Sequence, residues 1–447
     1  MSYSRWATEV EMKENLEKVN IKEGVKCSGI PLVYEDNNFY VNRSDIHNLI
    51  IGSTGSGKTQ SVVLPLLKLS MMANESMIIN DPLGELYKVN AKKLQDEGYK
   101  TIVIDLEDSR KGNNWNPLTL PYMLYKEGNK DKALDLIDDL GYYLFEDSNR
   151  NNSDPFWVNS VINYFTGITL YLFENAKEEE INLKSVESLT NQIHENKLSQ
   201  EFLEKIDSNS LIYSKLVGTL KAPSETKGSI LAVFRQKIEK YVAKENLTNM
   251  LSTTDFDITN IIKDKTAVFI ISGMSTQGEN LIPLFVNQII DIVSLYGKKE
   301  RNLVMLLDEF DDLLPIRNFA KKLTLCRYLG INVTVCIRSY IHLQNMYSKE
   351  EVEILKMCFG CIIYLLSSDI YTVEEISKYC GEVKENIPLI SKEELQTLNT
   401  FEAVVIMTRM MPFKTKLIPD YKIDWGYENE EMDIPERKIN NISIFKY

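Results

Sequence analysis

The chain has 447 residues, enough for roughly two to four domains of ordinary size or for one large domain with an insertion. Hydrophobic residues make up 44% and charged residues 26%, which excludes a disordered chain, a collagen-like chain and a disulfide scaffold. The net charge of −13 argues against a protein that coats nucleic acid with its whole surface. A local basic channel remains compatible with that charge, because net charge averages over all faces.

The six cysteines and three histidines do not form a recognisable metal site. Cys358 and Cys361 have ligand spacing, but a zinc site needs a second pair and none lies nearby. We therefore expect buried structural thiols and a reducing cytoplasm. No apolar run reaches the ~18 residues of a membrane-spanning helix, and the first residues lack the apolar core of a signal peptide. The sequence predicts a soluble chain without a transmembrane helix.

The first elements in chain order are a short helix over Thr8–Val19 and a hairpin over Ile30–Val41. From His47 onward, short apolar runs that are typical of buried strands alternate with longer stretches of helical character. The expected strands are His47–Ile51, Met77–Asn80 and Thr101–Asp105, and the expected helices are Thr59–Ala73 and Glu85–Glu97. This alternation predicts a mainly parallel sheet with right-handed crossovers.

From Pro121 to Ser252 the strand patterns vanish and apolar residues recur at helical spacing. The expected helices are Ala133–Phe145, Trp157–Phe173 and Ile230–Ala243. We expect an inserted all-α domain with four buried side chains: Phe156, Trp157, Phe165 and Leu172. The polar stretch Asn182–Ser210 is expected to be its most exposed part. Such a domain would fold alone and bind the cargo, while the remaining core would still bind nucleotide.

Strands resume after the helical stretch, at Ala267–Ile271, Leu303–Leu307, Val333–Ile337, Ile362–Leu366 and Ala403–Met407. Residues 412–447 are polar and punctuated by prolines, so we expect a loosely packed tail.

A glycine-rich segment after the first expected strand fits the phosphate-binding pattern GxxxxGK[ST] in full. Its residues are Gly52, Ser53, Thr54, Gly55, Ser56, Gly57, Lys58 and Thr59. Glycines let backbone amides curl around phosphate oxygens, and the following helix adds its positive end. We expect Lys58 to reach the β- and γ-phosphates and the Thr59 hydroxyl to bind Mg²⁺. The segment predicts an ATP site.

A second acidic motif follows the expected strand Leu303–Leu307, where Asp308 and Glu309 stand side by side. A buried strand of an α/β sheet delivers such residues to the ligand-binding edge. We expect Asp308 to join the Mg²⁺ shell and Glu309 to polarise the attacking water. The two motifs are 308 − 58 = 250 residues apart, and the helical insertion accounts for this separation.

The strand Val333–Ile337 is followed by Arg338, where motors of the RecA type place a polar residue that senses the γ-phosphate. Arg338 is the residue expected in that role, and an ordinary arginine at a strand end is the alternative. The predicted fold is a RecA-like α/β P-loop NTPase with an inserted all-α domain. The expected domains are a discontinuous nucleotide-binding domain at 1–120 and 253–447 and an all-α domain at 121–252.

Four further motifs occur in the order known from one family. They are Asp81-Pro-Leu-Gly-Glu-Leu-Tyr87, Trp115-Asn-Pro-Leu118, Asp154-Pro-Phe-Trp157 and Leu307-Asp-Glu-Phe310. From Arg5–Thr8 to about Gly381 the chain resembles the coupling ATPases of conjugative type IV secretion, the TraG and VirD type. The resemblance implies a hexameric RecA-like motor that uses ATP and Mg²⁺. It implies that relaxase-bound single-stranded DNA, or a protein substrate, is brought to the secretion channel.

Some positions depart from the family's pattern. The sensor glutamine is replaced by Arg338, a second glutamine by His342, and the lysine of the "DPKGELY" motif by Leu83. Family members usually carry transmembrane helices before the segment that matches Arg5–Thr8, so we expect an anchor that was cut away or is a separate protein. The resemblance also makes Arg327 the expected arginine finger, acting across a subunit boundary.

The implied location is the cytoplasmic face of the cell membrane, next to other type IV secretion components. Two alternatives stay open. The chain could be a DNA translocase of the FtsK or HerA kind that works without a secretion channel. It could also be a substrate adaptor, in which nucleotide only switches assembly. ATP turnover stimulated by single-stranded DNA would separate a motor from an adaptor.

Overall fold

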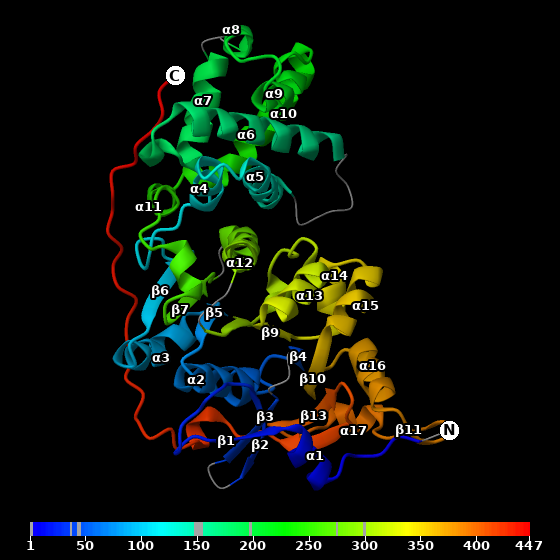
Figure 1. The fold of residues 1–447 in the computed structure, drawn as a ribbon. Helices are drawn as coiled ribbons and strands as arrows, with labels where there is room; N and C mark the ends of the chain where they lie inside the picture. Colours follow the sequence, from blue (N-terminus) through cyan, green and yellow to red (C-terminus); the bar gives the residue numbers. More distant parts are fainter. Residues whose placement is uncertain are drawn as a thin grey trace. The chain divides into compact units, whose positions relative to one another are not determined.

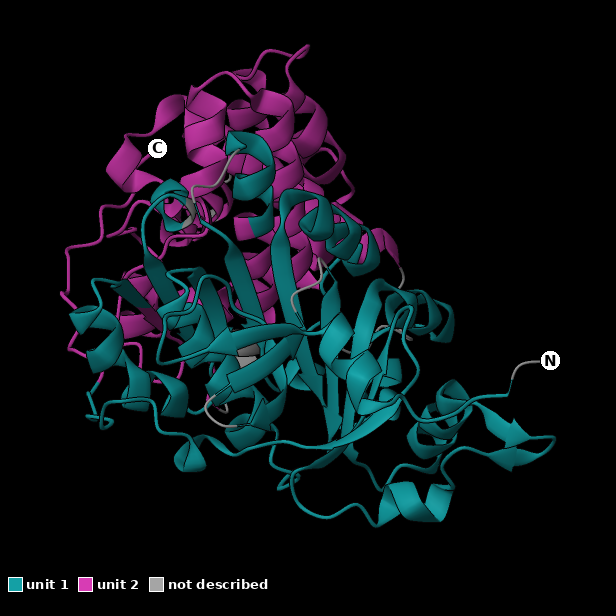
Figure 2. Ribbon diagram, turned by 60° about the horizontal axis from the view of Figure 1, so that its bottom comes forward, with its two compact units in different colours: residues 1–102, 259–271, 290–433 teal, residues 103–258, 272–289, 434–447 magenta. Residues whose placement is uncertain are grey.

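The structure, a computed structural model, describes residues 3–35, 38–42, 46–146, 155–195, 199–273, 276–297 and 301–447. The chain divides into two compact units, shown in different colours in Figure 2. Unit 1 consists of residues 1–102, 259–271 and 290–433, and unit 2 consists of residues 103–258, 272–289 and 434–447.

The central sheet has nine strands among the described residues, in the order β14-β13-β10-β4-β9-β8-β5-β7-β6. Their bounds are β4 His47–Gly52, β5 Ser76–Asn80, β6 Lys100–Asp105, β7 Thr266–Ile271, β8 Leu303–Leu307, β9 Ile331–Ile337, β10 Phe359–Leu366, β13 Glu402–Met407 and β14 Phe413–Lys416. From β10 through β4, β9, β8 and β5 to β7 the neighbours are parallel, whereas β13 and β14 are antiparallel. The expected mainly parallel sheet is confirmed.

The strands of this sheet are almost uninterrupted apolar runs because both faces of a parallel sheet are covered. Every residue of β4, β5, β7 and β8 is buried. The longer helical elements that lie wholly in this part of unit 1 are the π-helix η1 Thr59–Val63, α2 Leu64–Met72, α3 Glu85–Asp96, α13 Phe319–Leu329, α14 Tyr340–Met346, α15 Lys349–Cys358, α16 Ile370–Cys380 and α17 Lys392–Gln396, and the short 3₁₀ helices are η3 Ile258–Ile262, η4 Phe310–Asp312 and η5 Asp420–Lys422. The expected helix Thr59–Ala73 therefore has a π turn first, and Pro65 stands near the start of α2.

The first residues of unit 1 form a helix and a small antiparallel sheet. Helix α1 (Glu9–Asn15) begins after Thr8, which forms a capping box with Glu11. Strands β1 (Glu17–Asn20), β3 (Asn38–Asn42) and β2 (Ile30–Glu35) follow in that spatial order. The expected helix over Thr8–Val19 is thus too long, because the residues from Glu17 onward pair with β3 instead.

Unit 2 is helical: its helices are α4 Thr119–Lys126, α5 Lys130–Phe145, α6 Pro155–Asn175, α7 Leu183–Glu195, α8 Ser199–Glu204, α9 Leu211–Leu220, α10 Ser224–Val242 and α11 Glu245–Met250 (Figure 1). In its core, Phe145 stacks on Phe234 and meets the ring of Phe165 edge-on. Phe165 and Leu172 are buried as expected, whereas Phe156 is 51% exposed and Trp157 is half-buried. The prediction that Phe156 is buried is wrong, because its ring packs on the adjacent Trp157 at the first turn of α6 instead of on the core.

The stretch Asn182–Ser210 also differs from expectation. It contains α7 and α8, and the apolar side chains of α7 at Val186, Leu189 and Ile193 are fully buried. The polar residues between these positions mask a regular amphipathic helix. The expected exposed cargo surface is therefore in large part core.

The unit boundaries differ from the expected domains. Residues 121–252 all lie in unit 2, which also takes in 103–120, 253–258, 272–289 and 434–447. Within unit 2, Trp115 packs edge-on against Phe285, and Gln288 donates a hydrogen bond to the carbonyl of Pro117 at 2.8 Å. These contacts explain why residues 103–120 and the first part of α12 (Thr276–Tyr296) cluster with the helices.

The tail is not loosely packed. Residues 413–416 form β14, and the Lys68 ammonium makes a buried ion pair with Asp420 at 2.8 Å and lies 5.4 Å from the centre of the Trp425 ring. Residues 434–447 pack on unit 2 instead of on the nucleotide-binding unit. The sequence predicted loose packing for both segments because their anchoring partners are far away along the chain.

Among the described residues, none of the helices combines the length and apolarity needed to cross a bilayer. The six cysteines all lie among the described residues and form no disulfide, and Cys361 is buried in β10 as expected. In the same part of the chain no three His, Cys, Asp or Glu residues gather as a metal cluster.

Candidate functional site

The glycine-rich loop leaves the carboxyl end of β4, in the middle of the central sheet. Gly55 and Gly57 have φ values of +79° and +93°, a conformation that residues with a Cβ rarely adopt. A Cβ at Gly52 would clash with the Ser56 hydroxyl. The Ser53 amide donates to the Leu366 carbonyl at 2.8 Å, which ties the loop to the end of β10. The loop therefore has the curled form that cradles phosphates.

Lys58 and Thr59 stand where this loop turns into η1. The Lys58 ammonium donates to the carbonyl of Gly52 and, at 3.4 Å, to that of Ser53. The Ser61 amide and hydroxyl both donate to the Gly57 carbonyl at 2.9 Å. These bonds hold the start of the helix against the loop, so the Lys58 and Thr59 side chains enter the cavity beside it.

Asp308 and Glu309 follow β8, on the same edge of the sheet. Asp308 is 7% exposed, and its Oδ1 accepts the Glu309 amide at 3.0 Å. Burial raises the pKa of Asp308 above its usual range. Glu309 has φ +47° and is exposed, and partial burial followed by the nearby Asp308 charge raises its pKa as well. The backbone thus turns sharply to aim two neighbouring carboxyls in different directions.

One cavity of about 430 Å³ in unit 1 brings most of the predicted residues together, whereas Gly52, Ser56 and Arg327 do not line it. It is lined by Ser53, Thr54, Gly55, Gly57, Lys58, Thr59, Gln60, Glu85, Asp308, Glu309, Asp311, Cys336, Ile337, Arg338, Thr400 and Phe401. The sequence had not predicted seven of these residues as part of the site: Gln60, Glu85, Asp311, Cys336, Ile337, Thr400 and Phe401. Glu85 was hidden in the "DPLGELY" motif, whereas Thr400 and Phe401 belong to a turn with no recognisable motif.

Arg338 lines this cavity, but its guanidinium is already paired. It makes ion pairs with Asp311 at 2.9 Å and with Asp312, and its backbone amide donates to Asp311 at 3.1 Å. The guanidinium of Arg338, the expected sensor, is therefore bound to the carboxylates of Asp311 and Asp312 in this structure. A contact between Arg338 and a phosphate would require that its guanidinium leave these carboxylates.

Arg327 does not lie at this cavity. It is exposed two residues before the end of α13, and α13 leads into the amino end of β9 at Ile331, whereas the cavity lies at the carboxyl ends of the strands. It lines a separate cavity of about 210 Å³ with Glu75, Asn302 and Asn332. Arg327 is thus remote from the phosphate-binding loop of its own chain.

The segment after β5 carries Asp81, which is 2% exposed. Its carboxylate accepts the Tyr87 amide at 2.7 Å, and the Asp81 carbonyl accepts the Gly84 amide at 3.1 Å. This turn starts α3 so that Glu85 faces the cavity. Burial raises the pKa of Asp81 to about 6. Leu83, which stands where the family has lysine, is 67% exposed.

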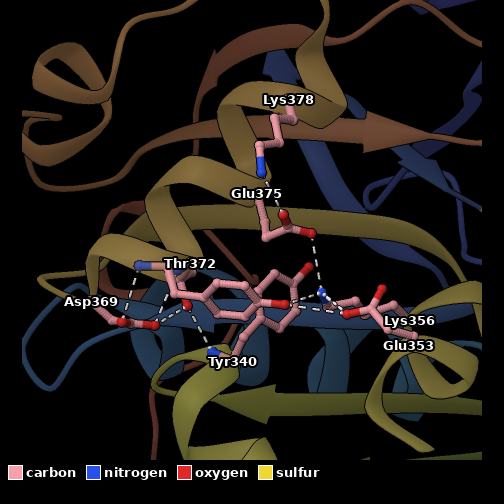
Figure 3. A network of polar contacts seen from close by, with 8 residues as sticks. Tyr340, Glu353, Lys356, Asp369, Thr372, Glu375 and Lys378 are labelled. Atoms are coloured by element: carbon pink, nitrogen blue, oxygen red, sulfur yellow. Dashed lines mark hydrogen bonds and ion pairs between the residues drawn. The ribbon is translucent and has the colours of Figure 1, made fainter. Parts of the chain in front are cut away.

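A buried lysine links the helices that follow β9 and β10. Lys356 of α15 is 1% exposed at its side chain, pairs with Glu353 at 2.7 Å and Glu375 at 3.2 Å, and lies 4.4 Å from the centre of the Tyr340 ring (Figure 3). The Tyr340 amide donates to the Thr372 hydroxyl at 2.8 Å. Tyr340 comes two residues after Arg338, so this network fixes the backbone at one side of the cavity.

The comparisons with known proteins agree with this arrangement. A family profile described as "Type IV secretory system Conjugative DNA transfer" matches residues 5–401. The chain belongs to this family. The family resemblance expected from the motifs is confirmed, although Asp154 of the "DPFW" motif lies outside the described residues. No curated protein sequence matches the chain.

Solved structures share the fold at low sequence identity. Plasmid coupling protein TrwB in complex with the ATP analogue ADPNP superposes with a TM-score of 0.70 at 18% identity and 94% coverage of each chain. TrwB in complex with ADP and Mg²⁺ has a TM-score of 0.68 at 17% identity, again with 94% coverage of each. VirB4 of Thermoanaerobacter pseudethanolicus has a TM-score of 0.53 at 12% identity, covering 88% of this chain and 98% of VirB4. The expected RecA-like α/β P-loop fold with a helical domain is confirmed.

Proposed function

We propose that this chain is an ATP-driven coupling motor of conjugation. It recruits relaxase-bound single-stranded DNA, or a protein substrate, to a type IV secretion channel and powers the transfer. One observation carries the proposal: in a member of the conjugative DNA transfer family, a single cavity is lined by Lys58, Thr59, Asp308 and Glu309.

The residues of the loop fit a nucleoside triphosphate. Gly55 and Gly57 leave the loop without side chains at its tightest points, and the buried Ser56 hydroxyl has no hydrogen-bond partner among the described residues. Phosphate oxygens would satisfy that hydroxyl and the loop amides. Lys58 would exchange the loop carbonyls for the β- and γ-phosphates, a stronger, charge-assisted contact. The TrwB complexes with ADPNP and with ADP and Mg²⁺ support the same ligand here.

The residues also fit Mg²⁺, which prefers oxygen ligands. The Thr59 hydroxyl and the Asp308 carboxylate would hold it. The raised pKa of Asp308 reflects a buried carboxyl that lacks sufficient positive charge nearby, and a divalent cation would supply that charge. When bound, the metal neutralises negative charge on the phosphates.

Glu309 is the residue we assign to orient and polarise the attacking water. Its raised pKa makes it a better proton acceptor than an ordinary glutamate at neutral pH. Arg338 would couple the cavity to motion by exchanging Asp311 and Asp312 for a phosphate. Arg327 lies far from the cavity of its own chain, so as an arginine finger it would act on a neighbouring subunit of a homo-hexamer.

The proposed place of action is the cytoplasmic face of the cell membrane, beside other components of the secretion system. Unit 2 is the proposed receptor for relaxase and cargo, because its helices contribute nothing to the lining of the nucleotide cavity.

The decisive experiment measures ATP hydrolysis with and without single-stranded DNA over a range of protein concentrations. A motor of this kind hydrolyses ATP faster with DNA and at concentrations that favour assembly. Nucleotide binding with no DNA-stimulated turnover would favour the adaptor instead. Stimulation by duplex DNA alone, without any response to relaxase, would favour a translocase of the FtsK or HerA kind.

A further inference from the structure

The last residues of the chain lie along unit 2, beyond the residues that the family profile matches. Arg437 anchors them. It is 5% exposed and donates hydrogen bonds to the Ser109 carbonyl at 2.9 Å, to Asn114 at 2.7 Å and to the Asn249 side chain at 2.6 Å. These bonds hold the start of the segment on unit 2.

Residues 443–447 lie beside α7, where the chain end is marked in Figure 1. Side chains of unit 2 form hydrogen bonds with their backbone. Asn182 donates to the Ser443 carbonyl at 2.9 Å, and the Phe445 amide donates to the Ser185 hydroxyl at 3.0 Å. Gln192 donates to the Phe445 carbonyl at 3.3 Å and accepts the Tyr447 amide at 2.9 Å.

These contacts fall on every second residue, which is the pattern of an extended peptide. In such a peptide alternate side chains share one face, and Phe445 and Tyr447 do so. Both rings pack on Tyr171, with centroids 6.4 and 6.3 Å away, and Tyr447 also meets the buried ring of Phe202 at 5.3 Å. Lys205 donates to the Tyr447 hydroxyl at 3.0 Å.

The side chains that form these hydrogen bonds are held in place by other contacts within unit 2. Asn182 and Ser185 are buried, and Asn182 accepts the Ser185 amide at 2.9 Å. Gln192 is held by a hydrogen bond to the Ser188 hydroxyl at 3.1 Å. A surface that presents fixed donors and acceptors to a peptide backbone recognises the extended conformation whatever the sequence, and its aromatic contacts supply selectivity.

We propose that this surface, formed by Asn182, Ser185, Gln192, Tyr171 and Phe202, is a peptide-binding groove. Residues 443–447 of the chain occupy it in cis. An extended segment of a protein cargo, with aromatic residues two positions apart, takes their place. The proposal extends the proposed function, because it names the part of unit 2 at which cargo docks.

The exchange is local because the two ends of the segment are held unequally. Arg437 is buried with several hydrogen bonds, whereas Phe445 is half-buried and Tyr447 is 36% exposed. Short, partly exposed segments with few buried contacts open without unfolding the rest of a domain. Residues 443–447 therefore lift away while Arg437 stays bound, and the cis segment lowers the apparent affinity for cargo.

The test uses the full chain and a fluorescein-labelled peptide with the sequence of residues 440–447. The double variant F445A/Y447A weakens the cis segment and frees the groove. We expect it to bind the peptide at least tenfold more tightly than the unsubstituted chain, measured by fluorescence anisotropy. Ile439→Ala is the matched control, since this side chain of the same segment is 65% exposed and should not change binding.

Two further arms decide the interpretation. Adding Gln192→Ala to the double variant removes the side chain that contacts Phe445 and Tyr447, and peptide binding should fall at least tenfold. A peptide in which both aromatic residues are alanine should not bind. The proposal is overturned if the double variant binds no peptide, if it loses its thermal transition, or if Gln192→Ala leaves binding unchanged.

Light scattering on the unsubstituted chain excludes a different occupant. If residues 443–447 of one copy fill the groove of another, the unsubstituted chain will form dimers and the F445A/Y447A variant will be monomeric. That result would show that the occupant is a second copy of the chain instead of cargo. This experiment does not involve ATP, whereas the motor is tested by ATP turnover, so the two proposals fail independently.

Discussion

The ring of Phe401 lies against Gly57 in the phosphate-binding loop, so closely that a Cβ at position 57 would come within 2.7 Å of a ring carbon. Phe401 has φ +68°, which costs energy for a residue with a side chain. Its turn is held by the Glu402 amide, which donates to the Asn399 carbonyl at 2.9 Å, and by the Leu417 amide, which donates to the Phe401 carbonyl at 2.9 Å. The ring is therefore a fixed wall of the nucleotide cavity.

Phe401→Ala should weaken nucleotide binding about tenfold, which corresponds to roughly 1.4 kcal/mol. The ring keeps water from one side of the loop and restrains Gly57. Titration with a fluorescent ATP analogue measures the effect. Tyr421→Ala, at an exposed tyrosine of the same unit, serves as the control. An unchanged dissociation constant for Phe401→Ala would show that the ring does not shape the site.

Lys58→Ala should abolish hydrolysis and weaken nucleotide binding, because the positive charge facing the β- and γ-phosphates is lost. Glu309→Gln should retain bound ATP and stop turnover, because only the group that polarises water is removed. The pair is measured by nucleotide titration and by phosphate release. Turnover near that of the unsubstituted chain in either variant would refute the assignment of the cavity.

Arg327→Ala should leave nucleotide binding intact and depress turnover, by as much as ~10³-fold if it resembles the arginine fingers of GTPases. Mixed oligomers of Arg327→Ala and Glu309→Gln chains should regain part of the activity, since some interfaces combine an intact finger with an intact cavity. Tyr328→Ala, at a neighbour that is 88% exposed, is the control. No recovery in confirmed mixed oligomers would mean that Arg327 does not act across subunits.

The buried Asp81 makes stability depend on pH. Its pKa is about 6 in the folded chain, above the ordinary value of 3.8, so the unfolded chain gives up this proton first as the pH rises. Asp81 therefore lowers stability progressively between about pH 4 and pH 6 and by a constant amount above that. Asp81→Asn keeps the acceptor for the Tyr87 amide but has no carboxyl to titrate. The melting temperature of the variant, minus that of the unsubstituted chain, should therefore be a few degrees larger at pH 8 than at pH 4. If the difference in melting temperature between the two proteins is the same at pH 4 and at pH 8, the prediction is wrong.

The buried pair of Lys68 and Asp420 gives a prediction for stability alone. Asp420→Asn leaves an ammonium that is 1% exposed without its counter-charge, which should cost about 3–5 kcal/mol. The nearby pair of Lys22 and Asp424 is the matched control, because both partners are largely exposed. Asp424→Asn should change stability by at most ~1 kcal/mol. Urea unfolding followed by circular dichroism compares the two, and equal effects would contradict the role of burial.

The motif residues were predictable because each depends on neighbours in sequence. Lys58 and Asp308 follow strands that are plain apolar runs, and β8 begins and ends where expected. Phe401 and Arg338 were harder for one shared reason. Their positions depend on residues that no local pattern connects to them: Gly57 for the ring of Phe401, and Asp311 for the Arg338 guanidinium.

The same reason explains where the compact units and their packing differ from the expected domains. The many polar residues of Leu183–Glu195 obscured the amphipathic pattern of helix α7 in the sequence. No local sequence pattern marks Arg437 as a buried residue. Its partners Asn114 and Asn249 lie more than a hundred residues away along the chain. Phe156 shows the converse, since a large apolar side chain at a helix start need not face a core.

The division of the chain also constrains how this protein can be cut or recombined. The backbone passes between the units at five places, 102/103, 258/259, 271/272, 289/290 and 433/434. One of them falls inside β6 and another inside α12. A protease that cleaves once leaves the two units tethered by four other crossings. Grafting the helical unit onto another ATPase as residues 121–252 would leave behind its own first and last segments, so specificity in such chimaeras has to be transplanted by surface residues, not by whole domains.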